Sequence, residues 1–299
     1  MSQQVGDYLD LHKARIDGEI AGEIARRLEE VGNISPHLTK VVQAIKELSV
    51  SGKRLRGLLT VLGYEIAGGE LNQEIYKAAG AMEIFHLGLL IQDDVMDRDD
   101  LRRGVKTVHA RYEDKHLGES VAICAGDLTF GWVTEILAGL SISKERVTAA
   151  IKVWGKYFGR VGYGQILDVM GEQRDGGKQE VLRVLELKSG EYTCVLPLQL
   201  GAALAGADGR LMERLDNYGR ELGWVFQLRD DWLSEYGDTG KTGKPVGNDR
   251  REGRKSYATL YGKEATEKEI MKHLAKGKEF AEGDKVLRGL LDWMATREN

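Results

Sequence analysis

Cysteine and proline are scarce in this chain. Of its 299 residues, two are cysteine and three are proline. A framework of several disulfide bonds, which small secreted domains use to supplement a small core, is therefore excluded. Cys124 and Cys194 lie in the apolar stretches VAICAG and YTCVLP, so we expect both to be buried thiols.

An excess of positive charge and long apolar runs are also absent. Lysine and arginine number 43 against 47 acidic residues, a net charge of −4, and nucleic-acid binding generally needs a basic surface. No window reaches the run of about eighteen apolar residues that a membrane span needs. The N-terminal MSQQVGDYLDLHKARIDGEI has no apolar core of signal-peptide length. We expect a cytoplasmic protein without a membrane span.

Apolar residues recur with the 3.6-residue period of an α-helix, and no stretch alternates as a strand would. The clearest helical segments are 8–31, 74–92, 144–171 and 209–236. Neither a linker nor a shift in composition divides the chain. The sequence predicts one all-α domain over residues 1–299, with roughly ten or more helices. The longest glycine-rich loop, GDTGKTGKPVGND at 237–249, is a candidate lid or clamp.

Carboxylates are concentrated at 87–104, LGLLIQDDVMDRDDLRRG, which holds five aspartates behind an apolar lead-in. Asp93 and Asp97 are four residues apart and would share one face of a helix, with Asp94 turned to the side. Like charges at this spacing repel, so a compensating cation is expected. Magnesium, which prefers carboxylate oxygens, water and phosphate as ligands, fits that requirement.

A second acidic pair, Asp230-Asp231, lies late in another apolar helix, in FQLRDDWLSEYGD. The two acidic clusters could face each other across a cavity. Taken alone, each acidic cluster would more often be a solvated surface. The glycine-rich loop is not a nucleotide-hydrolase phosphate loop either, because GKTGKPVG lacks the residue order of that motif. What indicates a site is their combination with cations suited to phosphate, which are Lys53, Arg56, Arg102, Arg103, Lys188 and Lys244.

The order of these motifs resembles that of the trans-isoprenyl diphosphate synthases over nearly the whole chain. GKRLRG, DDVMDRDDLRRG, GQILDVMGE, LKSGEYT and FQLRDDWLSEYGD match the family's successive motifs. The resemblance implies packed helices around a deep central cavity, usually in a homodimer. It also implies a head-to-tail (1′-4) condensation of isopentenyl diphosphate with an allylic prenyl diphosphate.

The resemblance further assigns roles by position. The residues implied to bind isopentenyl diphosphate are Lys53, Arg56, His86 and Arg103. Two or three Mg²⁺ ions, for which Mn²⁺ could substitute, would be held by Asp93, Asp97 and Asp230, with help from Asp94 and Asp231. The allylic diphosphate would be bound by Arg102, Lys188 and Lys244, with Ser189 and Gln227 nearby and Gln165 and Asp168 in support. The implied catalytic residues are Asp93, Asp97, Lys188, Asp230 and Lys244.

The chain departs from the family pattern at Ser234, where a third aspartate is usual, and Arg254 or Lys255 must serve for a lysine after the loop. Asp231, Ser234 and Asp238, at steps of three and four, could instead form the magnesium triad of a class I terpene cyclase. Against that alternative, GKRLRG, His86 and Arg103 would serve a second substrate that a cyclase does not bind. A catalytically weak partner subunit of a synthase is a third possibility.

Product length in this family depends on side chains four, five and eight residues before the first aspartate, here Leu89, Gly88 and Phe85. Gly88 cannot block a growing chain. Phe85 lies three residues further, about 4.5 Å deeper along a helix and close to one isoprene unit. We therefore expect a C20 product, geranylgeranyl diphosphate, with C25 the next candidate.

Overall fold

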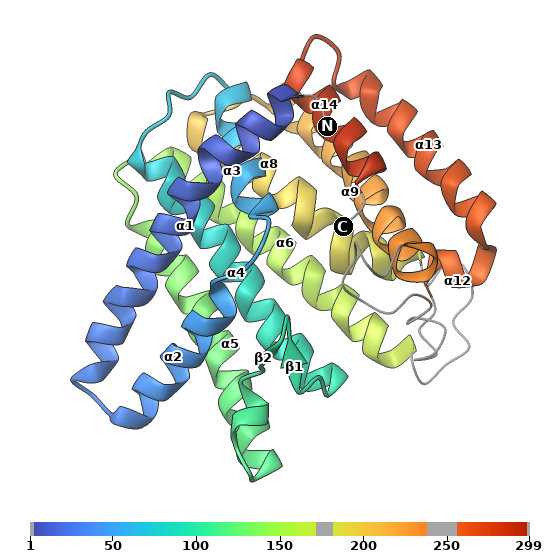
Figure 1. Cartoon of the computed structure of the whole chain (residues 1–299). Helices are drawn as coiled ribbons and strands as arrows, with labels where there is room; N and C mark the ends of the chain where they lie inside the picture. The colour runs from blue at the N-terminus through green and yellow to red at the C-terminus, as the bar shows by residue number, and fades with distance from the viewer. Residues whose placement is uncertain (1–2, 172–181, 238–255, 298–299) are drawn as a thin grey trace.

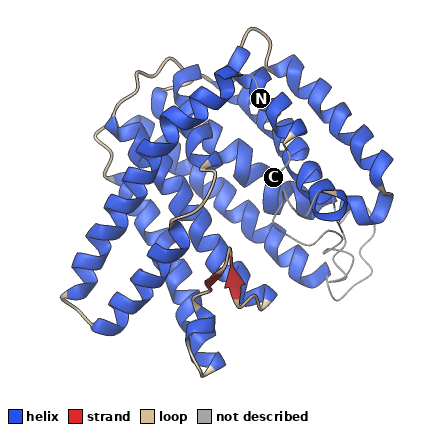
Figure 2. Cartoon of the chain, viewed as in Figure 1, coloured by secondary structure: helices blue, strands red, loops and turns tan. Residues whose placement is uncertain are grey.

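The computed structural model describes residues 3–171, 182–237 and 256–297, which form a bundle of helices (Figures 1 and 2). The long helices are α1 (Gln3–Gly32), α2 (Pro36–Ser49), α3 (Leu55–Ile66), α4 (Gln73–Asp97), α5 (Lys115–Ala138), α6 (Lys144–Gly171), α8 (Leu196–Ala205), α9 (Gly209–Tyr236), α13 (Lys263–Phe280) and α14 (Lys285–Thr296). Shorter elements are the 3₁₀ turn η1 (His109–Arg111), the π-helix η2 (Leu185–Val195) and α12 (Tyr257–Tyr261). The predicted all-α fold with ten or more helices is confirmed.

Side-chain caps fix where the helices that carry the acidic clusters begin. The amide oxygen of Asn72 accepts hydrogen bonds from the backbone N–H groups of Glu74 and Ile75 at the start of α4. Asp208 accepts one from Leu211 at the start of α9. Such caps satisfy N–H groups that the helix itself leaves unpaired. Both helices then run without interruption to their acidic ends.

A short β-hairpin follows α4 and departs from the strand-free prediction. Leu101–Arg102 (β1) pairs with Val105–Lys106 (β2) in antiparallel register. The two residues between them, Arg103 and Gly104, have φ of 53° and 80°. Positive φ at both central positions is the requirement of a type I′ turn, one of the two turns favoured in two-residue hairpins. The hairpin holds Arg102 and Arg103 beside the acidic end of α4.

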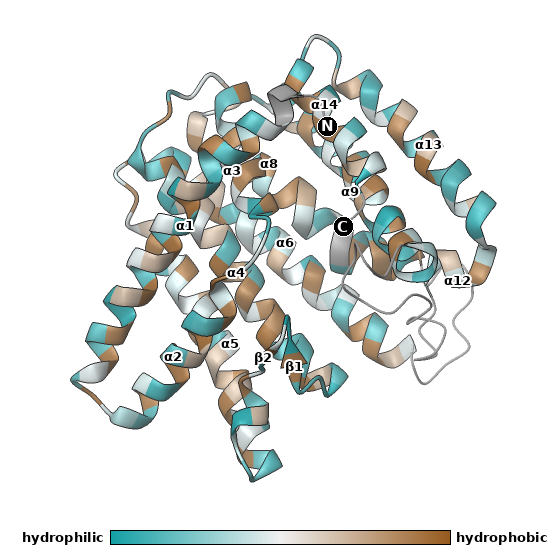
Figure 3. Ribbon diagram, in the orientation of Figure 1, coloured by the Kyte–Doolittle hydropathy of each residue, from teal (hydrophilic) through white to brown (hydrophobic). Residues whose placement is uncertain are grey.

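The buried apolar side chains form two clusters. One joins α1, α2, α4, α5 and α6 with parts of α3 and α8, and the other joins α9, α12, α13 and α14 with further residues of α3 and α8. Alternating brown and teal along α1 and α13 in Figure 3 marks helices that bury one face only. Because α3 and α8 contribute to both clusters, they connect the two parts of the bundle.

The connection between α3 and α8 depends on glycine. A Cβ atom at Gly201 of α8 would lie 1.9 Å from the backbone oxygen of Thr60, and one at Gly63 of α3 would lie 2.1 Å from that of Leu198. Backbone atoms cannot move aside as the end of a flexible side chain can. Only glycine therefore permits this separation of the two helices.

Part of α5 is apolar yet unburied. Cys124 on this helix is exposed, so the expectation of two buried thiols is wrong for Cys124 and right for Cys194. Ile123 and Leu128 on the same helix are 48% and 39% exposed. By length and composition α5 could cross a membrane, but 44% of its most apolar window is buried in the fold. Core helices of soluble proteins pass the same test, so this feature is weak support for a span.

The close contact between α3 and α8 can be tested by substitution. Gly201→Ala should lower the free energy of unfolding by about 2 kcal/mol, because the added methyl group would overlap the backbone of α3. Gly22→Ala in α1, where a Cβ meets no atom within 4 Å, should raise it by about 0.5 kcal/mol through helix propensity. Urea denaturation of both variants measures the difference. Equal effects of the two substitutions would contradict the proposed role of the α3–α8 contact.

Candidate active site

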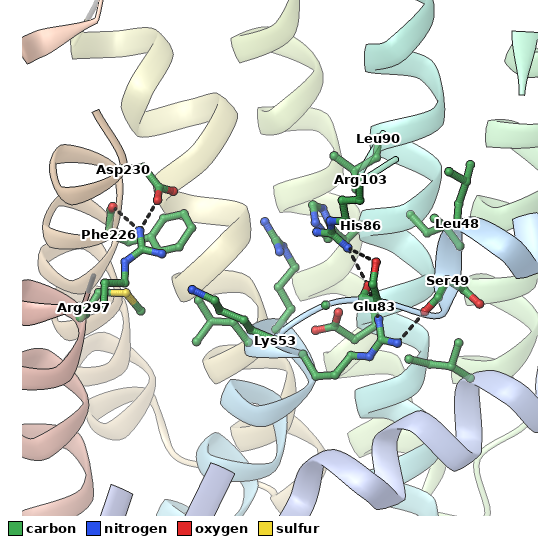
Figure 4. Close-up of a pocket in the computed structure, with 18 of the residues that line it drawn as sticks. Leu48, Ser49, Lys53, Glu83, His86, Leu90, Arg103, Phe226, Asp230 and Arg297 are labelled. Carbon is green, nitrogen blue, oxygen red and sulfur yellow. Dashed lines mark hydrogen bonds and ion pairs between the residues drawn. The ribbon is translucent and has the colours of Figure 1, made fainter. Parts of the chain in front are cut away.

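The larger cavity, of about 590 Å³, lies where the two apolar clusters meet, and we call it the basic pocket (Figure 4). Its walls come from α4, α9, α14, the α2–α3 loop and the hairpin turn. The charged and imidazole groups that line it are Lys53, Arg54, Arg56, Glu83, His86, Arg103, Asp230 and Arg297. Cations outnumber carboxylates here, so the pocket favours an anion.

The α2–α3 loop is fixed by arginine side chains. Arg54 adopts φ of 55°, which is uncommon for a residue with a side chain. Its guanidinium donates to the backbone oxygen of Ser49 and to the carboxylate of Asp17, each at 2.5 Å. Arg103 donates to the backbone oxygen of Ser51 at 2.6 Å. The loop that presents Lys53 is thus tied to α1 and to the hairpin.

Crowded positive charge alters the protonation of this pocket. Burial, reinforced by Arg297 and opposed by Asp230, lowers the pKa of Lys53. Burial and the neighbouring arginines, Arg56 first among them, hold the pKa of His86 well below its usual value. His86 is therefore a neutral imidazole near pH 7. A bound anion such as a diphosphate would relieve the repulsion among these groups.

The smaller cavity, of about 280 Å³, adjoins the first at Leu90, and we call it the apolar pocket. At its polar end Asp93 accepts a hydrogen bond from Gln165 at 3.0 Å and lies 3.1 Å from the ammonium of Lys188. Lys188 also lies 2.5 Å from Asp168. Burial alone would lower the pKa of Lys188, but the two carboxylates outweigh it and raise it. Side chains of α4, α6 and η2 thus meet in one ionic cluster.

Aromatic rings close the other end of the apolar pocket. Phe158 lines it, whereas Phe85 is fully buried behind, 5.2 Å from Phe158 between ring centroids. Phe130 and Trp154 pack against both rings. The cavity therefore ends on an aromatic wall contributed mainly by α6.

The three predicted chain-length positions behave differently. Leu89 lines the apolar pocket and Phe85 does not. Gly88 faces α5, where a Cβ atom would lie 1.9 Å from Thr129 Oγ1. Its lack of a side chain serves helix packing, so the argument that Gly88 leaves room for a growing chain is not supported.

Lys188 belongs to η2, whose hydrogen bonds span five residues instead of four. Such windings are rare and often occur at functional sites. Arg160 of α6 and Arg220 of α9 both bind the carboxylate of Glu191, which is 1% exposed. A buried carboxylate needs such partners, and this pair holds η2 against α6 and α9.

Several predicted ligands have partners within the protein. Asp94, fully buried, binds Arg102, and burial raises its pKa to about 6 against the pull of that arginine. Asp231 accepts hydrogen bonds from Gln227 and from the backbone of Tyr257, each at 2.9 Å. These contacts give Asp94, Arg102, Asp231 and Gln227 structural roles that the sequence did not indicate.

Other predicted residues divide between described and undescribed parts of the chain. Asp97 lies one turn beyond Asp93 on α4, as predicted. Ser189 is part of η2, and its side chain is not described. Lys244, Asp238, Arg254, Lys255 and most of the 237–249 loop lie outside the described residues.

The carboxylates suit a divalent metal in chemistry. Asp93, Asp97 and Asp230 offer hard oxygen ligands, and cations of the protein itself neutralise two of them, Lys188 at Asp93 and Arg297 at Asp230. Among the described residues, no three metal-binding side chains converge on one point. A bound metal ion would therefore share these carboxylates with the cations of the protein.

Sequence reasoning missed Arg297, Arg54 and Tyr192. Arg297 binds Asp230 and donates to the backbone oxygen of Phe226 at 3.1 Å, as Figure 4 shows. Arg297 stands outside every recognisable motif, so nothing in its sequence context indicates a role. Arg54 and Tyr192 lie inside GKRLRG and LKSGEYT, the motifs that also contain the predicted residues Lys53, Arg56 and Lys188.

The comparison with known proteins agrees with this site. Residues 36–291 match the sequence model of the family described as polyprenyl synthetase. This chain belongs to the polyprenyl synthetase family. It is 31% identical over 287 residues to the short chain isoprenyl diphosphate synthase of Methanocaldococcus jannaschii, covering 93% of this chain and 82% of that protein.

Two further relatives of this polyprenyl synthetase bear on its chemistry. It is 35% identical to the geranylfarnesyl diphosphate synthase of Aeropyrum pernix over 230 residues, 75% of this chain and 70% of that one. Its fold matches that of the geranylgeranyl pyrophosphate synthase of Corynebacterium glutamicum with a TM-score of 0.87 and 27% sequence identity. The match covers 97% of this chain and 99% of that one, whose structure is complexed with isoprenyl diphosphate and magnesium. The chain is a prenyltransferase. The family and these relatives are isoprenyl diphosphate synthases, so they do not support the alternative of a terpene cyclase.

The neutral state of His86 has a measurable consequence for stability. Below pH 6.5 the unfolded chain binds a proton at His86 and the folded chain does not. The free energy of unfolding therefore decreases as the pH is lowered, by up to about 1.4 kcal/mol per pH unit. His86→Asn lacks this contribution. We expect the free energy of unfolding of the variant, minus that of the wild type, to increase steadily as the pH is lowered from 6.5 to 5. Urea denaturation measures this difference, and its value at pH 8 serves as the reference. A difference independent of pH would show that folded His86 titrates normally.

Proposed function

We propose that this polyprenyl synthetase condenses isopentenyl diphosphate with an allylic prenyl diphosphate, head to tail, to give a trans-polyprenyl diphosphate. The observation that carries the proposal is the adjacency of two pockets of different character. One is rich in cations and suits a diphosphate, while the other has an ionic end and an apolar interior. Two diphosphate substrates, one with a long hydrocarbon tail, fit that division.

The residues divide accordingly. Lys53, Arg56, His86 and Arg103 would bind the diphosphate of isopentenyl diphosphate in the basic pocket. Lys188, with Gln165 and Asp168, would orient the allylic diphosphate at the ionic end of the apolar pocket. Arg102, Ser189, Gln227 and Lys244 remain proposed contacts of that diphosphate.

Asp93, Asp97 and Asp230 would hold two or three Mg²⁺ ions, with Asp94 and Asp231 behind them and Mn²⁺ a possible substitute. The bound metal would supply Lewis-acid stabilisation of the departing diphosphate. The neighbouring cations of the protein add to that stabilisation, and the apolar pocket excludes water from an allylic carbocation. No nucleophilic side chain is required.

We propose a cytoplasmic, soluble homodimer built from a single domain over residues 1–299. The exposed apolar side chains of α5, Ile123 and Leu128, with Cys124 between them, support an interface there. Large exposed apolar side chains grouped on one helix are typical of interaction surfaces. Sedimentation of the purified protein would give its mass directly.

For the product we propose geranylgeranyl diphosphate, C20, with C25 next. Gln165, which contacts Asp93, and Phe158 are seven residues apart on α6, or about 10 Å. At about 4.5 to 5 Å for each isoprene unit, this depth holds about two units. A third unit, the one that carries the diphosphate, lies at the ionic end of the pocket. The allylic substrate that fills it is C15, and one condensation gives C20.

Asp93→Ala should lower turnover by about 10²- to 10³-fold, because the site loses an oxygen ligand worth several kcal/mol. The assay combines labelled isopentenyl diphosphate with C5, C10 or C15 allylic primers in Mg²⁺ and separates the dephosphorylated products by length. Titration with Mn²⁺ by electron paramagnetic resonance should show weaker binding, and EDTA should abolish wild-type turnover.

Asp100→Ala is the matched control for Asp93→Ala. The Asp100 side chain is 85% exposed, and its removal changes the net charge of the same segment equally. Turnover should stay within twofold of wild type. A comparable loss in both variants would mean that segment charge, and not a metal ligand, is responsible.

Phe158→Ala should lengthen the product by at least one isoprene unit, because it removes the ring that closes the apolar pocket. Phe85→Ala alone should leave the product unchanged, since Phe158 still stands in front of it. The same assay reads both variants. Lengthening by Phe85→Ala alone would place the floor on α4.

A further inference from the structure

Tyr192 stands between the two pockets. Its ring lines the apolar pocket, and its hydroxyl contacts two residues of the basic pocket. Arg56 Nη2 lies 2.7 Å from this hydroxyl and His86 Nδ1 lies 3.2 Å from it. The guanidinium of Arg56 also packs over the ring, 4.4 Å from its centroid. Tyr192 is 9% exposed, so these contacts largely replace water.

The directions of the two hydrogen bonds follow from chemistry. Arginine has donors only, so the phenol oxygen accepts from Arg56. The single phenolic hydrogen is then left for His86 Nδ1. A neutral imidazole has one donor and one acceptor nitrogen. If Nδ1 accepts, Nε2 carries the proton.

The setting of His86 favours this neutral form. Of the charged groups that act on it, the strongest are Arg56, Arg103, Arg102 and Arg54, all cations. A second proton on the ring would add charge to an already cationic pocket. His86 lines that pocket and can serve there as an uncharged donor.

We propose that Tyr192 is a positioning residue that fixes the Nε2–H tautomer of His86 and the orientation of Arg56, and so aligns both donors toward a diphosphate in the basic pocket. The inference rests on the proposed function for the identity of that diphosphate. The tautomer itself does not depend on it. Thr193, whose hydroxyl accepts from Arg56 Nη2 at 2.8 Å, holds the guanidinium from a second side.

Tyr192→Phe tests the proposal, because it removes the hydroxyl and keeps the ring that lines the apolar pocket. In ¹⁵N-histidine-labelled protein, with the His86 signals identified by their loss in His86→Asn, the wild type should show the Nε2–H tautomer. Tyr192→Phe should show a shift toward Nδ1–H or a mixture. The KM for isopentenyl diphosphate should rise about tenfold, with the KM for the allylic substrate and the product length unchanged.

Two variants serve as controls. In Thr193→Val a side chain of nearly the same shape replaces threonine, and Arg56 loses one hydrogen bond while the contacts of His86 stay as they are. This variant should raise the KM for isopentenyl diphosphate and leave the tautomer as in wild type. Tyr163→Phe, on the exposed face of α6 with 63% of the residue accessible, should change neither measurement.

A wild-type His86 in the Nδ1–H form, or a Tyr192→Phe protein with unchanged tautomer and KM, would overturn the proposal. A protein that shows the expected tautomer shift but incorporates no isopentenyl diphosphate would instead refute the proposed function. The two failures are therefore distinguishable in one set of samples.

Discussion

Charge compensation at the ends of α4 and α9 is the constraint on which the site depends. Asp93 of α4 and Asp230 of α9 each line a cavity, and each pairs with a cation of the protein. Lys188 lies between Asp93 and Asp168 and so joins α4, α6 and η2. Arg297 does the same for α9 from the far end of α14.

The 3.6-residue period of the apolar residues predicted most of the helices. The segments 144–171 and 209–236 coincide with α6 and α9. The π-helix was missed because its hydrophobic pattern differs little from that of an α-helix. The hairpin was missed because two-residue strands have no alternation to detect. The contact of α3 with α8 depends on interhelical separation, which a single sequence does not encode in any local pattern.

At the site, the sequence identified which residue types take part but not how they pair. Asp93, Lys188, His86 and Arg56 lie in the two pockets. Asp94 and Asp231 resemble their neighbours in sequence, yet each points into the protein interior and binds a partner there. One step around a helix rotates a side chain by about 100°, so adjacent aspartates have different environments. Arg297 could not be found at all, because its partner is 67 residues away.

The winding of η2 limits changes in length more than changes in composition. Lys188 and Tyr192 both line the apolar pocket, but Lys188 joins the ionic cluster whereas the Tyr192 hydroxyl contacts Arg56 and His86 of the basic pocket. Their relative direction is set by the number of residues between them. Deleting one residue there would rotate one side chain against the other about the helix axis, separating the ionic cluster from the contact with Arg56. Substitutions that keep the count would leave that geometry intact. Evolutionary or engineered variation of this segment should therefore proceed by replacement of side chains and not by insertion or deletion.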